Sequence, residues 1–464
     1  MHVRTLRLFS FLLGFAASIA TACPARAGEV IPAPTQLPTT LSLNDALRMF
    51  HATGLDLLIA DASTRSAEGA VKIAGAVPNP TFSASVGNAF TYSTGDPTQC
   101  MAGGSSVSCS PWIYQVGLTD SSAIVDSLSG KRTLRLKAAR NALAAAKMSR
   151  ADAERTLALQ VKSAYAQVAQ AELGYKFARE IASSNATTLK KTQERYKAGA
   201  IQEGELMRVE TQKLESDQAQ DTAANNLEDA RYALAFLLGV RGRVSDFDVD
   251  TTVLDYATPA PLQSATAVSL LRAAFDHRPD LIALGYQRAS AEAQIALAKR
   301  QNFPNIELGV TYAWGGYGGA GTNGPLQTPT ITFGLTVPLP IFYQQGGEIR
   351  QAEAAYDTSA LQQAKTTAQV VNDVSTAFAN FTTAKHLVER MEGPRRAGGG
   401  LLQSAKGAFE TTAVLYERGA TTLTDYLDAL RTYIATKVEY IGDLTNYWTA
   451  IYQLEAAVGM DLRK

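Results

Sequence analysis

The sequence has few of the residues that usually carry catalysis or metal binding. Its 464 residues include three cysteines, four histidines and seven methionines, and these do not cluster. No Ser/His/Asp set, no pair of catalytic acids and no phosphate-binding glycine loop followed by a helix is present. His51 and His277 are single histidines on short predicted helices, where surface positions are more common than catalytic ones. The sequence therefore predicts no enzyme, no cofactor and no metal site.

Long apolar runs and an excess of one charge are also missing. Beyond the amino-terminal segment no stretch of about eighteen apolar residues occurs, so no helical membrane anchor is predicted. The chain has 43 basic and 43 acidic residues and a formal net charge of zero. This balance argues against nucleic acid as a partner.

The amino-terminal segment has the pattern of a secretory signal. Residues 1–27 begin with the basic residues Arg4 and Arg7, continue with the apolar stretch Leu8–Ala20 and end in a small-x-small cleavage site at Ala27. An alternative interpretation is lipidation at Cys23. The apolar stretch is too short to span a bilayer as a helix, so we expect the segment to be removed.

Two cysteines remain after cleavage at Ala27, and both lie in a segment rich in glycine and serine. Cys100 and Cys109 are separated by eight residues. In an exported chain an even pair of cysteines is typical of a disulfide. The alternative is two unpaired thiols; a metal site would need further ligands nearby. We predict a disulfide between Cys100 and Cys109.

The chain contains one pattern twice, at a spacing of about 220 residues, which is far too long for a solenoid repeat. The matching segments are Leu57–Pro80 with Leu281–Pro304, Tyr196–Ala200 with Tyr416–Ala420, and Gly239 with Gly459. A whole unit has therefore been duplicated. Each unit has the predicted order short helix, strand, loop, strand, very long helix, turn, long helix.

This order divides the chain into predicted regions. They are a signal at 1–27, a first repeat at 28–240, a linker at 241–262 and a second repeat at 263–464. The first repeat is expected to have strands at about 81–92 and 111–121 and long helices at about 131–197 and 203–239. The second is expected to have strands at about 305–315 and 329–338 and long helices at about 347–417 and 422–460.

The predicted strands alternate between apolar and polar or small residues. In one of them Leu308, Val310 and Tyr312 alternate with Gly309 and Thr311. About ten such residues with an aromatic end are typical of a transmembrane barrel strand, with glycine- and serine-rich stretches as external loops. A half-buried sheet in a soluble protein would have the same alternation but more than four strands. Four strands cannot close a barrel, so several copies must share it.

The predicted helices are unusually long. Residues 133–197 contain no proline and a single glycine, Gly174, and would span about 100 Å. Small residues recur on their heptad seam, which suggests a wall of closely packed helices rather than a simple coiled coil. The matching helix at 347–417 is expected to bend at Gly393 and Pro394. Such length suits a structure that crosses the periplasm.

Together these features resemble the TolC family of outer-membrane efflux ducts over essentially the whole mature chain. The motifs that carry the resemblance are Pro78-Asn79-Pro80, Pro338–Phe342 followed by Gly347–Arg350, and the paired Tyr-x-x-Gly turns. The resemblance implies a mainly α fold with a β-barrel part. It also implies a homotrimer in outer-membrane lipid, whose twelve-stranded barrel continues as a periplasmic tunnel of helices.

The resemblance is strongest to the branch that serves resistance-nodulation-division pumps. It implies a passive duct for drugs or metal ions that works with a periplasmic adaptor and such an inner-membrane pump. Alternatives are the outer-membrane duct of a type I protein secretion system and a secreted coiled-coil adaptor or adhesin.

The family resemblance also places functional roles at the helical turns. It assigns the ring of acids around the periplasmic entrance to Asp425 and Asp428, which lie three residues apart and so share a helix face. Three copies would bring six carboxylates together, a field that attracts cations. Thr422 and Asp425 also form a predicted capping box, and both roles can hold together. In the first repeat Glu205 stands at the position of Asp425 and is expected to contribute to the aperture, and Arg208 stands at the position of Asp428 and is expected to take part in gating.

The turn residues themselves complete the predicted site. Tyr416 matches a tyrosine that in the family helps to lock the closed state, and Tyr196 is its counterpart. Gly199 and Gly419 mark the turns at which the adaptor is expected to dock. A basic residue found in the family two positions after the second glycine is replaced here by Thr421, so different locking bonds are expected.

Overall fold

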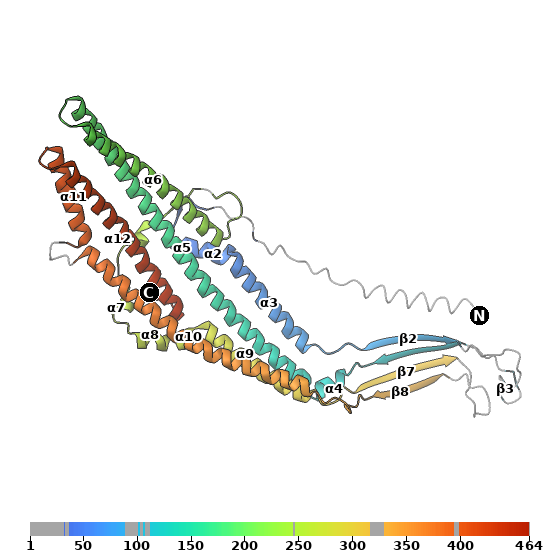
Figure 1. Cartoon of the computed structure of the whole chain (residues 1–464). Helices are drawn as coiled ribbons and strands as arrows, with labels where there is room; N and C mark the ends of the chain where they lie inside the picture. The colour runs from blue at the N-terminus through green and yellow to red at the C-terminus, as the bar shows by residue number, and fades with distance from the viewer. Residues whose placement is uncertain are drawn as a thin grey trace.

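The computed structural model describes residues 32, 37–88, 101–102, 105–106, 112–244, 246–315, 329–393 and 399–463. They form an elongated helical body with an antiparallel sheet at one end and two helical hairpins at the other (Figure 1). The predicted signal, Cys23 and the predicted disulfide between Cys100 and Cys109 lie outside these residues.

The first repeat supplies five helices and one of the two hairpin tips. They are α2 (Leu43–Thr53), α3 (Leu55–Gly75), α4 (Ala123–Leu128), α5 (Lys131–Lys197) and α6 (Glu203–Leu237). α5 runs the length of the body and packs against α3, α6, α9 and α12. Its 67 residues correspond to about 100 Å of helix.

The second repeat supplies the other hairpin. Its helices are α8 (Ala267–His277), α9 (Pro279–Arg300), α10 (Gly346–Glu392), α11 (Leu401–Glu417) and α12 (Leu423–Val458), and the predicted linker before it holds η1 (Thr251–Leu254) and most of α7 (Ala260–Gln263). The single bent helix predicted at 347–417 is divided into α10 and α11. Gly393 ends α10 with a φ of +69°, and the Gly400 N–H donates to the Glu392 carbonyl at 2.9 Å. Glycine at positive φ ends a helix more readily than it bends one.

The sheet has four strands in the order β2 (Thr81–Asn88), β5 (Trp112–Thr119), β7 (Glu307–Gly315) and β8 (Thr330–Thr336), all antiparallel. Two short pairs complete the strands. They are β1 (Thr40–Leu41), parallel to β6 (Asp248–Val249), and β3 (Met101–Ala102), antiparallel to β4 (Ser105–Ser106).

The strand register gathers the apolar side chains on one face of the four-stranded sheet. Phe82 faces Leu118, Leu118 faces Val310, and Val310 faces Phe333, which makes one apolar row across all four strands. These side chains are exposed, Phe333 by 81%. The opposite face carries mainly serine, threonine and glycine, together with Gln115, Ala313 and one large apolar residue, Ile113. An exposed apolar face with a polar reverse is expected of a barrel wall between lipid and a lumen.

Aromatic side chains collect near the loop end of this apolar face. Tyr114 stacks on Trp314 with ring centroids 5.5 Å apart, and Tyr312 lies 5.4 Å from the same indole. Such rings favour the boundary between lipid and water, because they combine an apolar body with a polar group.

The helical core lies where α5 crosses the middle of the body. Val161, Tyr165 and Val168 are fully buried there, and small residues of the predicted seam, such as Ala164, are buried beside them. The Tyr165 hydroxyl donates to the Leu41 carbonyl at 2.7 Å, which ties the β1–β6 pair to α5. In the described part of the chain, no helix is long and apolar enough to cross a membrane.

Candidate functional site

The two hairpin tips share one backbone turn. Gly199 and Gly419 both have a φ of +71°. The Gly199 N–H donates to the Tyr196 carbonyl at 2.9 Å, and the Gly419 N–H donates to the Tyr416 carbonyl at 3.0 Å. Each left-handed residue therefore closes its helix with the same type of turn. The repeat that the sequence shows at these turns is a repeat in structure.

The tyrosines of the two turns have different surroundings. Tyr196 is 40% exposed, whereas Tyr416 is 6% exposed. Tyr416 stacks on Tyr426 of α12 with centroids 5.1 Å apart, and the Arg195 guanidinium lies 5.4 Å from its ring centre. The position of Tyr426 is occupied by Leu206 in the first repeat. Tyr416 thus connects α11 and α12 to the end of α5, whereas Tyr196 has no such stack among the residues that the structure describes.

Asp425 lies in the first turn of α12 and caps this helix. Its carboxylate accepts hydrogen bonds from the Thr422 hydroxyl at 2.7 Å and the Thr421 hydroxyl at 3.0 Å. In return the Asp425 N–H donates to the Thr422 hydroxyl at 3.2 Å, which completes the predicted capping box. These hydrogen bonds, first that of Thr422, lower the pKa of Asp425. The side chain is exposed and ionised at neutral pH.

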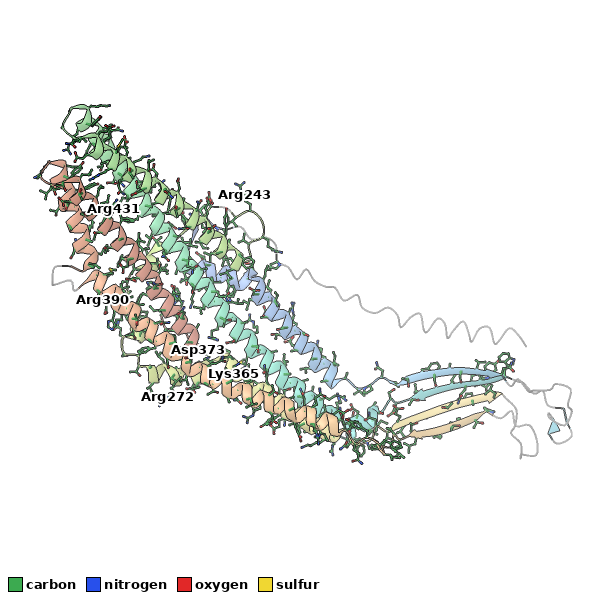
Figure 2. All side chains as sticks on the ribbon, in the orientation of Figure 1. Arg243, Arg272, Lys365, Asp373, Arg390 and Arg431 are labelled. Atoms are coloured by element: carbon green, nitrogen blue, oxygen red, sulfur yellow. The ribbon has the colours of Figure 1, made fainter. Side chains whose placement is uncertain are left out.

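Asp428 lies one turn further along α12 and faces a different neighbour. It lines a groove of about 350 Å³ between the starts of α6 and α12, together with Arg208, Glu215 and Arg431. Figure 2 shows Arg431 on the part of α12 that approaches the tip. The structure thus brings Arg208 and Asp428 to one groove. Glu205 is not among the lining residues of this groove.

Sequence reasoning missed Arg431 and Gln212 in this groove. Gln212 is buried, and its Oε1 atom has no hydrogen-bond partner within the described residues. Arg431 follows Asp428 by three positions, so the same helix-face rule that paired the two aspartates could have found it. No comparable signal marks Gln212.

An apolar cluster beneath the tips holds the two hairpins together. It joins α5, α6, α11 and α12 through Phe177, Ile181, Val209, Tyr416, Leu423, Tyr426, Leu427 and Leu430. Phe177 meets Tyr433 edge to face with centroids 5.7 Å apart. An exposed ion pair, Lys191 with Glu417 at 2.7 Å, lies above this cluster and contributes little by itself.

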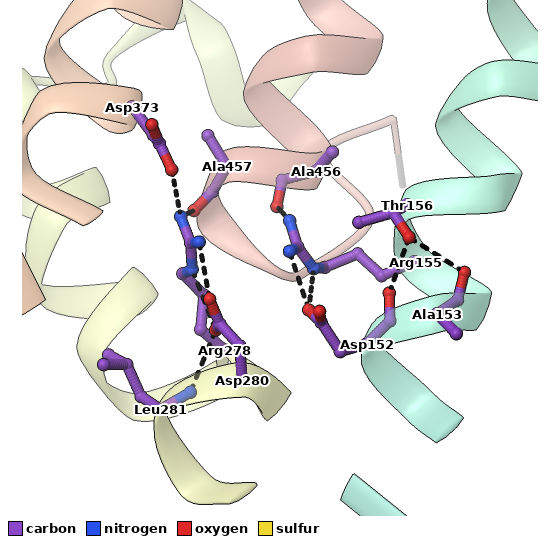
Figure 3. Close-up of polar contacts among 10 residues, drawn as sticks. All are labelled: Asp152, Ala153, Arg155, Thr156, Arg278, Asp280, Leu281, Asp373, Ala456 and Ala457. Carbon is purple, nitrogen blue, oxygen red and sulfur yellow. Dashed lines mark hydrogen bonds and ion pairs between the residues drawn. The ribbon is translucent and has the colours of Figure 1, made fainter. Parts of the chain in front are cut away.

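A second polar site, which sequence reasoning missed, lies where α12 ends in the middle of the body (Figure 3). Arg278 is 4% exposed and donates to Asp280 at 2.7 Å, to Asp373 at 3.1 Å and to the Ala457 carbonyl at 3.2 Å. Burial raises the pKa of Asp280, but the hydrogen bond from Arg278 and the positive charges of Arg278 and Arg155 together outweigh it, so the net shift of the pKa is downward. The positive charge of Arg278 therefore balances the partial negative charge at the end of α12, and Asp280 and Asp373 balance the charge of Arg278.

Arg155 performs the same task on the α5 side of this helix end. It pairs with Asp152 and donates to the Ala456 carbonyl (Figure 3). Two carbonyls in the last turn of α12 are therefore satisfied by guanidinium groups. Among the described residues, no group of three or more histidine, cysteine, aspartate or glutamate side chains could hold a metal ion.

Comparison with known proteins matches both repeats to the same family. The profile of the family described as outer membrane efflux protein matches residues 50–240 and 270–460. The cobalt-zinc-cadmium resistance protein CzcC of Cupriavidus metallidurans is 25% identical over 443 residues, which cover 92% of each chain. The pyoverdine export outer membrane protein OpmQ of Pseudomonas aeruginosa is 23% identical over 418 residues, which cover 90% of this chain and 84% of OpmQ.

Solved structures of outer-membrane channels have the same fold. The outer-membrane channel OprN matches with a TM-score of 0.70 at 18% identity, covering 91% of each chain. CusC matches with a TM-score of 0.69 at 15% identity, covering 95% of this chain and 99% of CusC. The open state of the MtrE channel of Neisseria gonorrhoeae matches with a TM-score of 0.69 at 19% identity, covering 90% of this chain and 89% of the MtrE chain.

Proposed function

The chain belongs to the outer membrane efflux protein family, and from that premise we propose that three copies assemble into a passive duct fed by an inner-membrane pump through a periplasmic adaptor. The protein is an efflux channel of the outer membrane with a tunnel that extends into the periplasm. The observation that carries the proposal is the four-stranded sheet, whose apolar face is exposed and which continues into long helices, of which α5 is about 100 Å long.

The edge strands of this sheet support a barrel that is shared by three copies of the chain. In the described part of the chain β2 and β8 each pair with one strand only. Strand direction alternates along the sheet order, so β8 of one copy beside β2 of the next would again be antiparallel. Four strands are too few for a barrel with a lumen, and three copies supply twelve.

A cysteine pair across the proposed junction tests the assembly. The Ser83→Cys/Thr332→Cys variant, with one cysteine on each edge strand, should form disulfide-linked oligomers up to a trimer. The matched Ser85→Cys/Gln115→Cys variant joins register partners within one chain and should form none. Native mass measurement in detergent should give three times the mass of the mature chain. A stable monomer by mass, with no linked oligomers, would exclude the shared barrel.

We further propose that Asp425 and Asp428 of three copies surround the periplasmic entrance. Both are exposed, both lie at the start of α12, and threefold symmetry would place six carboxylates around one axis. Such a ring favours cations and binds multivalent ones. Asp425→Asn with Asp428→Asn should therefore weaken cation selectivity and block by trivalent cations in planar bilayers. If the variant keeps both properties of the parent, the two residues do not form the aperture.

The adaptor is proposed to dock at the six tips of the trimer and in the groove behind them. This groove of about 700 Å³ lies between α6 and α12, with small residues of α5 at its base, including Ala171, Gly174 and Ala178. Helical hairpins fit such a groove because small residues allow close approach of helix backbones. Cross-linking from cysteines placed along α6 should capture an adaptor purified with the channel, and capture only from β2 would contradict the docking site.

The pump selects the cargo, and the names of two relatives suggest candidates. One relative is a cobalt-zinc-cadmium resistance protein and the other exports pyoverdine. We propose metal ions as cargo, in agreement with an acidic entrance. Deletion of the gene should increase sensitivity to zinc, cobalt and cadmium salts, and a plasmid copy should restore resistance. Unchanged metal sensitivity together with increased drug sensitivity would reject this cargo but not the duct.

A further inference from the structure

All four connections between the sheet and the helices present large apolar side chains to solvent. These connections lie close to one level, where the strands meet the helical body (Figure 1). Phe342 is 99% exposed and Leu128 is 82% exposed. We name these residues the apolar collar: Val77, Leu128, Phe303, Leu339, Ile341 and Phe342. Isolated exposed apolar residues are ordinary, but one in every connection at a single level indicates an interaction surface.

The described strands are too short to cover the lipid by themselves. The apolar positions of β7 run from Leu308 to Trp314, which is about 20 Å along the strand and about 15 Å along the membrane normal at the usual tilt. The apolar band of a transmembrane barrel is about 25 Å tall. Aromatic rings already mark the loop end of the sheet. Within the described residues, the apolar surface that adds height to this band is the collar at the helix end.

Hydrogen bonds hold the most exposed part of the collar away from the helices. The Tyr343 hydroxyl donates to Glu348 at 2.6 Å and accepts from the Gly347 N–H at 3.0 Å. Tyr343 is thereby fixed to the first turn of α10. Phe342, its neighbour, remains fully exposed instead of folding onto this helix.

Basic side chains follow the collar directly on its helical side. Lys72, Arg132, Arg300 and Arg350 come from the ends of α3, α5, α9 and α10 that meet the sheet. Arg132 donates to the Gly75 carbonyl at 2.8 Å. Arg300 is held in the same way by a carbonyl at 2.7 Å. Lys72 and Arg350 have no ion pair within the described residues.

Most acidic groups at this level are already engaged; Asp120 accepts the Leu308 N–H at 2.8 Å, whereas Glu307 at the start of β7 has no ion pair within the described residues. Asp126 is paired with Arg135 at 2.7 Å, and Glu348 accepts the hydrogen bond of Tyr343. Glu353 lies 3.5 Å from Lys299. Within the described residues none of the four basic residues is paired with an acidic group, so they can contact anionic groups directly beside an apolar surface.

We propose that the apolar collar and these four basic residues bind phospholipids of the periplasm-facing leaflet of the outer membrane. Acyl chains contact the collar, and phosphate groups contact the lysine and arginine side chains, which suits amphipathic cations at a membrane boundary. The collar thus completes the lipid-facing band that the strands begin. The inference rests on the proposed duct. The rival occupant is a neighbouring copy of the chain, since β8 is an edge strand.

Photo-crosslinking in native membranes distinguishes these occupants. Phe342→p-benzoylphenylalanine should give a phospholipid adduct after irradiation, detected as an added lipid mass on the intact protein. Phe333→p-benzoylphenylalanine, on the apolar face of β8, is the positive control. Val268→p-benzoylphenylalanine, on exposed α8 in the helical body, should give no lipid adduct.

Each outcome decides one question. A protein dimer, or no adduct, from position 342 alongside a lipid adduct from position 333 overturns the collar and leaves the duct intact. No lipid adduct from position 333 would instead overturn the lipid-facing sheet on which the duct rests. A lipid adduct from both positions supports the collar.

The basic residues have a separate readout. In nanodiscs of phosphatidylcholine and phosphatidylglycerol, Lys72→Gln/Arg350→Gln should lower retained phosphatidylglycerol about fivefold, as measured by native mass spectrometry. Arg272→Gln/Lys365→Gln removes the same charge from the helical body, away from the sheet (Figure 2), and should not change retention. Equal retention by both variants would overturn the phosphate contacts.

Discussion

The last helices of the two repeats, α6 and α12, end at equivalent positions, but different side chains satisfy the carbonyls at their ends. α6 ends before Gly239, which packs on the α2–α3 joint at Thr53, and α12 ends before Gly459, which packs on the α8–α9 joint at Arg278. In the first repeat the Thr53 hydroxyl donates to the carbonyl of Leu238, the residue that caps the end of α6, at 2.7 Å. In the second repeat a buried guanidinium donates to the matching end of α12 at 3.2 Å.

This difference shows what duplication preserved. Both halves keep a helix end that meets a joint, because the backbone geometry demands that its carbonyls be satisfied. The satisfying group was free to change. A hydroxyl needs no further partner, whereas buried Arg278 needs Asp280 and Asp373 to balance its charge. The second half has therefore become more dependent on a network.

The largest expected effect comes from removing the charged cap. Arg278→Ala leaves Asp280 half-buried without its partner and should destabilise the protein by about 3–5 kcal/mol. Thr53→Ala removes one neutral hydrogen bond and should cost about 1–2 kcal/mol. Thermal unfolding followed by circular dichroism in detergent would rank them. Equal shifts in melting temperature would mean that the network contributes no more than the hydroxyl.

Substitution of Gly239 and Gly459 tests how closely the ends of α6 and α12 approach the α2–α3 and α8–α9 joints. A Cβ at Gly239 would lie 2.1 Å from the Thr53 carbonyl oxygen, whereas at Gly459 it would lie 3.3 Å from Arg278 backbone atoms. Gly239→Ala should therefore add about 1–3 kcal/mol of overpacking to the cost of about 1–2 kcal/mol for an L-residue at positive φ.

Gly199→Ala at the first tip is the matched control for this prediction. Gly199 has a similar φ of +71°, against +75° at Gly239, but open space around its Cβ position. It should therefore incur the backbone cost alone. The same melting experiment should rank Gly239→Ala above Gly459→Ala and Gly459→Ala above Gly199→Ala. A Gly239→Ala variant as stable as Gly199→Ala would contradict the close approach.

A pH-dependent difference is expected between the two tips. At the first tip, the N-cap residue of α6 is Gln202, whose side chain makes no capping hydrogen bond. At the second tip, Asp425 completes a capping box with Thr422 at the start of α12. The folded pKa of Asp425 lies below its usual 3.8, so its stabilisation is present at higher pH and is lost as pH falls through the folded value. Asp425→Asn should therefore loosen the first turn of α12 at pH 6 and have less effect at pH 2.5.

Hydrogen exchange measures this difference locally. At pH 6 the first turn of α12 should exchange several-fold faster in Asp425→Asn than in the parent, and the difference should be smaller at pH 2.5. Glu205→Gln is the matched change at the first tip and should leave α6 nearly unchanged at both values. A variant-to-parent ratio that is the same at both pH values would show that ionisation of Asp425 does not stabilise the cap.

The smallest expected effect concerns the outer loops, where the two halves differ in cysteine content. The predicted Cys100–Cys109 disulfide belongs to the first hairpin, and the matching loop of the second has no cysteine. Unreduced protein should be lighter by two hydrogens than the reduced form, and Cys100→Ser/Cys109→Ser should change melting little because the closed loop is short. Complete alkylation of both thiols without reduction would disprove the bond.

Much of the fold follows from local sequence pattern. Alternation placed the strands near their observed positions, and the absence of proline allowed α5 to run from Lys131 to Lys197. The capping box at Thr422 was readable because it needs only residues three positions apart. The division between α10 and α11 was not predicted, because a glycine followed by proline is compatible with either a bend or an end.

The sequence by itself determined the duplication, the two-faced strands, the long helices and the paired Tyr-x-x-Gly turns, since each depends on neighbours along the chain. Only the tertiary structure decided that Tyr416 is buried and Tyr196 exposed, that Arg208 and Asp428 share a groove, and that Arg278 lies inside the body. These outcomes depend on where α5, α6 and α12 pack against one another. Identical motifs therefore acquire different environments from contacts between residues hundreds of positions apart.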